Sequence, residues 1–186
     1  SNIALGGTCL TVSMEQDNQR LGETWEMLKK LLDIPGASAT MAVFAGSFKN
    51  CRSQALMKDC DFILDRMLAR QDEQVQSDAA SLIASIVTRG PNVSEDRVEK
   101  LTAGMLKQLK ASSSLQVQCE ILNALIDMYS SDDTYCDTFE KLDVISFFQE
   151  AVSGSKRNQL PAHSEHEAET LMNAESFVEY KLQHMR

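Results

Sequence analysis

Apolar side chains along this chain recur every three or four residues, the spacing that places them on one face of an α-helix. Leu21, Trp25 and Leu28, for example, follow one another at intervals of four and three residues. The alternation typical of half-buried strands is not sustained in the sequence. The pattern predicts an all-α protein of about eight helices joined by short turns. The predicted apolar stripes are 21–32, 56–67, 75–86, 98–109, 117–128, 139–148 and 168–182, with a short helix at 38–48.

Two of these helices repeat one pattern. The stretch DEQVQSDAASLIASIV recurs as SLQVQCEILNALIDMY, with Val75 of the first matching Val117 of the second at a shift of 42 residues. The same shift carries the preceding helix from Leu56 to Val98. A two-helix unit that recurs at about 40–47 residues is typical of HEAT and armadillo repeats. The sequence therefore predicts a HEAT/armadillo-like α-solenoid of antiparallel helix pairs.

The repeat and the breaks between helices predict the organisation of the chain. Ser94, with acidic residues directly after it, is expected to cap the helix that follows. The first repeat matches the shift weakly, as expected of an irregular or capping terminal unit. The Ser-Asn start without Met indicates a vector scar. We expect a scar and irregular lead-in at 1–16, HEAT-like helical repeats at 17–152, a polar linker at 153–162 and a C-terminal capping helix at 163–186.

Composition narrows the class of partner. The formal net charge is −9, and no stripe of Lys and Arg is visible, so direct binding of nucleic acid is not expected. An acidic surface serves solubility, or favours a basic partner if it is functional. No run of about 18 apolar residues predicts a membrane span. The five cysteines are irregularly spaced, which favours reduced thiols in an intracellular protein.

The sequence offers no set of residues that predicts catalysis. No glycine-rich loop followed by Lys and Ser or Thr is present, so a phosphate-binding cofactor is not expected. The segment HSEHEAE places His163 and His166 among glutamates, an arrangement that in principle binds a metal ion. It lacks the HExxH pattern, and a solvated helix start explains it more simply. We therefore expect no enzyme activity, no cofactor and no metal.

The polar side of the second helix in each repeat is the candidate binding surface, because second helices line the concave face of such solenoids. Stacked repeats are expected to place Asp78 beside Glu120, and paired carboxylates flanked by amides suit Lys and Arg heads and peptide backbone. The alternative is that these side chains are only the solvated side of amphipathic helices. The predicted partner-binding residues are Gln74, Asp78, Ser81 and Ser85 in one helix, and Gln116, Glu120, Asn123 and Asp127 in the next.

The C-terminal half carries two short patterns in a characteristic order. EILNALIDMYSSDD, which begins at Glu120, fills a pattern E-x-L-x-A-L-x-D-x-[FY] followed by an acidic corner, and FVEYK, which begins at Phe177, fills F-[IV]-x-Y. Together they resemble the C-terminal HEAT-repeat region of the symportin family. The resemblance covers about the last 85–90 residues, and the preceding helices share only the general rhythm of helix pairs.

The resemblance implies a function. Symportins are adaptors that carry two ribosomal proteins of the 5S ribonucleoprotein into the nucleus with an importin. It implies a non-enzymatic adaptor or chaperone in cytoplasm and nucleus, whose acidic concave surface binds a basic ribosomal-protein segment, with the importin bound through regions that this chain lacks. The alternative is a HEAT/armadillo scaffold that binds a peptide or a helical subunit in a signalling, transport or cytoskeletal complex.

Overall fold

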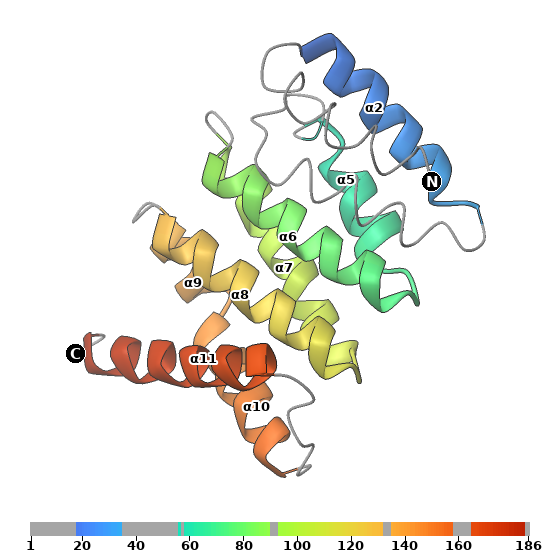
Figure 1. The fold of residues 1–186 in the computed structure, drawn as a ribbon. Coiled ribbons are helices and arrows are strands. Elements are labelled where there is room, and N and C mark those ends of the chain that lie inside the picture. Colours follow the sequence, from blue (N-terminus) through green and yellow to red (C-terminus); the bar gives the residue numbers. More distant parts are fainter. Residues whose placement is uncertain are drawn as a thin grey trace. The chain divides into compact units, whose positions relative to one another are not determined.

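The computed structural model describes residues 18–34, 56, 58–89, 93–131, 135–157 and 165–184. All regular elements in these ranges are helices, which confirms the all-α prediction (Figure 1). The chain divides into two compact units, residues 1–93 and 94–186. The predicted lead-in at 1–16 and the short helix predicted at 38–48 lie outside the described residues.

Trp25 is buried in the first unit. This unit contains α2 (Asn18–Leu31), a short α5 (Cys60–Phe62), a π-helical stretch η1 (Ile63–Leu68) and α6 (Glu73–Arg89). The Trp25 side chain is 1% exposed, and its ring meets Phe62 edge to face with centroids 6.0 Å apart. The stripe predicted as one regular helix from Leu56 to Met67 is buried as expected. Its second half winds as a π-helix, which the spacing of apolar residues does not reveal.

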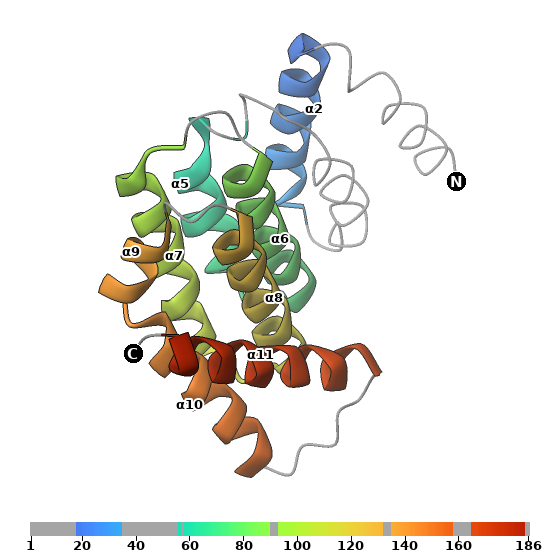
Figure 2. The ribbon, with the colours of Figure 1, turned by 90° about the vertical axis from the view of Figure 1, so that its left-hand side faces the viewer.

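The second unit is a helical hairpin covered by the C-terminal helices. α7 (Glu95–Ala111) and α8 (Leu115–Ser131) are joined by three residues and pack against each other, so they run antiparallel. α9 (Cys136–Lys141) and α10 (Val144–Arg157) pack against α7, and α11 (Glu165–His184) packs against both α8 and α10. Figure 2 shows α11 lying across these two helices.

The two repeated helices keep their register to the residue. α6 and α8 each span 17 residues, and the shift of 42 relates both their starts and their ends. Asp72 precedes α6, and its Oδ1 accepts a hydrogen bond from the Val75 N–H at 3.1 Å. Ser114 precedes α8, and its Oγ accepts one from the Val117 N–H at 3.4 Å. Each repeated valine is therefore the third residue of a helix whose first turn is capped by a side chain.

Two sequence expectations need correction. Ser94 does stand at the start of α7 with extended backbone, but its side chain makes no capping hydrogen bond. Its carbonyl instead accepts hydrogen bonds from Arg97 and Val98 at 3.0 Å each. α10 runs to Arg157, so it occupies the first half of the segment 153–162 that was expected to be a polar linker.

Candidate functional site

The polar side of α6 is largely closed to solvent. Gln74 is exposed, and its Nε2 lies 3.3 Å from Oδ1 of Asp78, to which it donates a hydrogen bond. Ser81 and Ser85 are half-buried. Asp78 differs from the prediction, because it is only 4% exposed although it was expected on the open face. In this structure Gln74 is therefore the one exposed residue of this predicted row.

The polar side of α8 is partly used within the protein. Gln116 and Asp127 are exposed, whereas Glu120 and Asn123 are half-buried. The Asn123 Nδ2 donates a hydrogen bond to Thr170 Oγ1 of α11 at 3.0 Å. The predicted row of α8 is thus bordered by α11, and Asn123 serves to hold that helix. The predicted alignment of Asp78 with Glu120 stays a prediction, because the two residues belong to different units.

The two helices that meet at the junction of α8 and α11 are rich in acidic residues. Over their lengths the two helices carry seven Asp and Glu residues and a single lysine. Cys119 lies within this junction and approaches the Glu167 carbonyl, with its sulfur 3.8 Å from the oxygen. Burial, and then the carboxylates of Glu167 and Glu120, raise the pKa of the Cys119 thiol to about 12. Cys119 is therefore a neutral thiol at physiological pH, without the thiolate that nucleophilic attack or metal binding requires.

Metal-binding and membrane features can be tested only on the described part of the chain. Within it, no three His, Cys, Asp or Glu side chains come together as a metal site requires. His163 lies outside the described residues, and the side chain of His166 is not described either. None of the helices in the described ranges combines the length and apolar character needed to cross a membrane.

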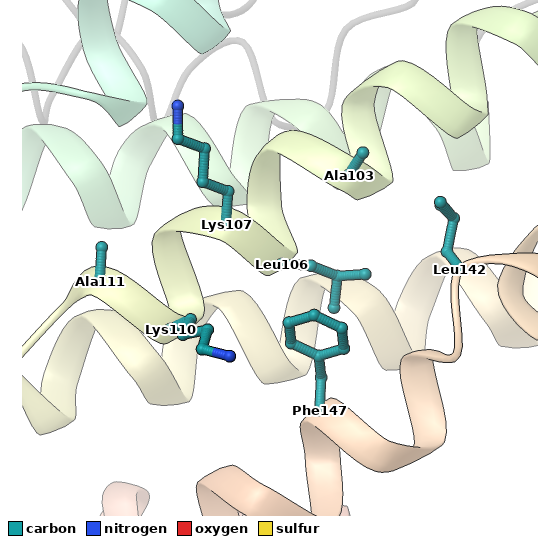
Figure 3. A pocket seen from close by; sticks show the side chains of 7 residues that line it. All are labelled: Ala103, Leu106, Lys107, Lys110, Ala111, Leu142 and Phe147. Carbon is teal, nitrogen blue, oxygen red and sulfur yellow. The ribbon is translucent and has the colours of Figure 1, made fainter.

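The structure adds a site that the sequence analysis missed. A groove of about 340 Å³ in the second unit is open to solvent and lies between α7 and the start of α10 (Figure 3). Lys110 points toward the Phe147 ring, with its Nζ 6.0 Å from the ring centroid, and Lys107 points away from it. The lining residues are Ala103, Leu106, Lys107, Lys110, Ala111, Leu142 and Phe147.

One feature of the sequence does point to this groove. Phe147 and Phe148 are adjacent, and neighbours on a helix project about 100° apart, so they do not both face one core. Phe148 is fully buried, whereas Phe147 is half-buried and lines the groove. The adjacent aromatic residues near the start of α10 were therefore a signal in the sequence that one of them lies outside the core. The sequence did not show that α7, with Lys107 and Lys110, packs beside it.

The helix pairs and the repeat register of the described residues define the class of protein. It is a helical-repeat protein. A comparison with models of known protein families matches residues 9–185 to the family described as "SYO1-like, TPR repeats". The chain belongs to this family, which confirms the resemblance to symportins. Comparisons with curated proteins and with solved structures gave no match.

Family membership also fixes the coarse role. It points to a repeat-protein adaptor that takes part in the handling of ribosomal proteins. The family description uses the term TPR, whose repeats span about 34 residues, whereas the helix pairs here recur at the longer HEAT-like period. The two descriptions agree on a stack of antiparallel helix pairs.

Proposed function

We propose that this chain is the repeat region of an adaptor and chaperone that binds a basic segment of a ribosomal protein of the 5S ribonucleoprotein. The bound client would be protected from RNA until it is delivered for assembly. Import into the nucleus would use an importin bound by parts of the protein outside this chain, and the adaptor would work in both cytoplasm and nucleus.

The acidic character of α8 and α11, two helices that pack against each other, is the observation that carries this proposal. Asp127, Glu169 and Glu179 are exposed, and Glu120 is half-buried beside Cys119. Carboxylates on contacting helices produce a negative field that speeds the capture of a basic client. Salt screens this field, so capture should slow as the salt concentration rises. Charge-assisted hydrogen bonds to Lys and Arg heads are stronger than neutral ones, so the same groups also hold the client.

The experiment compares two charge-matched double variants. Glu120→Lys with Asp127→Lys should weaken binding of a Lys/Arg-rich ribosomal-protein peptide by about tenfold or more, since each change replaces an attraction with a repulsion. Glu140→Lys with Glu150→Lys makes the same change in net charge at exposed positions of α9 and α10. Equal affinities of the two variants would overturn the proposal. Far-UV circular dichroism checks the fold, and the isosteric pair Glu120→Gln with Asp127→Asn repeats the test without reversed charges.

The alternative function, a scaffold that binds a peptide or helical subunit, is favoured by a different observation. The groove between α7 and α10 exposes apolar surface in the second unit and carries lysines rather than carboxylates. A basic client does not suit it, so the groove requires a separate interpretation.

A further inference from the structure

We propose that the groove between α7 and α10 binds an acidic peptide segment of a second protein partner. An apolar side chain of that segment would sit on Leu106, Leu142 and Phe147, and its flanking carboxylates would meet Lys107 and Lys110. The proposal concerns a partner other than the basic client and does not depend on the proposed function.

The shape of the groove favours a peptide side chain. Its volume of about 340 Å³ is at the lower end for ligand sites, and the groove is open rather than enclosed. Leu106 and Leu142 form its apolar floor with Phe147, which remains half-exposed. An open apolar groove beside a helix is the usual seat for one or two anchor residues of an amphipathic segment.

The charge around the groove selects an acidic segment. Lys107 and Lys110 are both exposed, and no Asp or Glu lines the groove. Among the described residues neither lysine forms an ion pair, although Lys110 lies over the Phe147 ring. By contrast, Lys141 of the neighbouring α9 is paired with Glu99 of α7 at 2.7 Å. The lysines at the groove are therefore available to a partner's carboxylates.

The repeat provides an internal comparison. At the shift of 42 residues, Lys107 corresponds to Asp65 and Ala103 corresponds to Asp61, both of which are exposed. Lys110 corresponds to Leu68, so the preceding repeat carries no lysine at either position. A feature required only for stacking helix pairs is expected in every repeat. The lysines are special to this unit, which favours a binding role over a general structural one.

Two other occupants are less suited to the groove. A nucleic acid needs an extended row of cations, and the whole chain carries a net charge of −9. A basic segment would be repelled by both lysines and would leave them desolvated without partners. In an acidic segment with an apolar anchor, the anchor matches the apolar floor and the carboxylates match the two lysines at the rim of the groove.

The test measures the affinity of a fluorescein-labelled peptide in which Leu and Phe are separated by Glu residues, by fluorescence anisotropy. Lys107→Glu with Lys110→Glu should weaken binding by about tenfold or more. The control is Arg97→Glu with Lys100→Glu, which makes the same charge change at the same spacing on the first half of α7, away from the groove. It should bind the peptide nearly as the parent protein does. Equal loss in both variants, or no loss in either, would overturn the proposal.

Further measurements test the contributions of the apolar floor and of the two lysines separately. They also test whether a second copy of the protein occupies the groove. A peptide with Ala in place of Leu and Phe should bind at least about tenfold more weakly, and equal binding would show that the apolar floor is not used. Lys107→Gln with Lys110→Gln keeps the helix intact and should also weaken binding. If sedimentation shows that the protein alone dimerises and the Lys→Glu pair abolishes the dimer, the occupant is a second copy and the proposal fails. Affinity for the basic client should not fall in the groove variants.

Discussion

Tyr129 of α8 and Phe177 of α11 meet edge to face, with ring centroids 5.1 Å apart. Tyr129 closes the first pattern that resembles symportins, and Phe177 opens the second. Phe139 also packs edge to face against Tyr129, with ring centroids 5.3 Å apart. The rings of Phe148 and Phe177 are likewise 5.3 Å apart between centroids. The two patterns are therefore distant in sequence but form one aromatic cluster that fixes α11 to the repeat.

Phe177→Ala should release α11 from α8 and α10. Because Phe177 is half-buried, we expect a loss of about 3 kcal/mol in the free energy of unfolding, at the lower end for Phe truncation. Urea unfolding measures this loss, and hydrogen exchange should show α11 opening before α8. Met172→Ala, at a position of α11 that is 68% exposed, is the control and should change stability little. Equal losses in the two variants would contradict the role of the aromatic cluster.

Asn123→Ala tests whether this residue holds α11 or binds a client. The variant loses the hydrogen bond to Thr170, so it should lose about 1 kcal/mol of stability. Gln116→Ala, on the exposed part of the same row, should lose almost nothing. Chemical denaturation compares the two. If Asn123 also contacts a client, Asn123→Ala should bind the client more weakly under conditions in which both variants are fully folded. An unchanged stability of Asn123→Ala would contradict the structural role.

The sequence was sufficient for the features that depend on local spacing. Val75 and Val117 gave the repeat shift, and the structure places both at the third position of capped helices of equal length. A side-chain cap at Ser94 was predicted by residue type alone, and the structure shows that residue type does not decide whether the hydroxyl turns toward the helix. Helix boundaries near Arg157 were missed because Gly and Ser residues reduce helix propensity without ending a helix.

The candidate site was harder to predict because it depends on contacts between distant residues. Apolar spacing identifies the buried face of α8, but it does not say that α11 borders the polar face at Asn123, 47 residues before Thr170. The burial of Asp78 is likewise a tertiary effect. The groove arises where α10 packs against α7, and the pairing of those helices is not encoded in the periodicity of either.

The hydrogen bonds at the starts of α6, α7 and α8 predict how much stability three substitutions cost. Asp72→Ala and Ser114→Ala should each cost about 1 kcal/mol, because each leaves a valine N–H of the first helical turn without its side-chain acceptor. Ser94→Ala should cost clearly less, since no such hydrogen bond exists to be lost. Thermal and urea denaturation of the three variants under identical conditions gives the order. A loss at Ser94 equal to that at Ser114 would contradict the assignment of the caps.

Asp59 should make the first unit sensitive to acid. Trp25 Nε1 and Lys29 Nζ both donate hydrogen bonds to Asp59 Oδ2 at 2.7 Å. Burial by itself would raise the pKa of this carboxyl, but the hydrogen bonds from Lys29 and Trp25 outweigh burial and hold the pKa below its ordinary value of 3.8. A lowered pKa in the folded state means that the carboxylate adds stability above the unfolded pKa, and that this stability is lost as the pH falls through the folded pKa.

The measurement follows the unfolding of the parent protein and of Asp59→Asn between about pH 5 and pH 2, with Trp25 as the fluorescent reporter. The parent protein should lose more stability than Asp59→Asn over this range, because only it contains the carboxylate that must take up a proton. Asp33→Asn removes the partner of Arg66 in an ion pair whose side chains are 66% and 55% exposed, and it should follow the parent closely. Parallel profiles for the parent and Asp59→Asn would show that the contact with Trp25 and Lys29 does not set the acid stability.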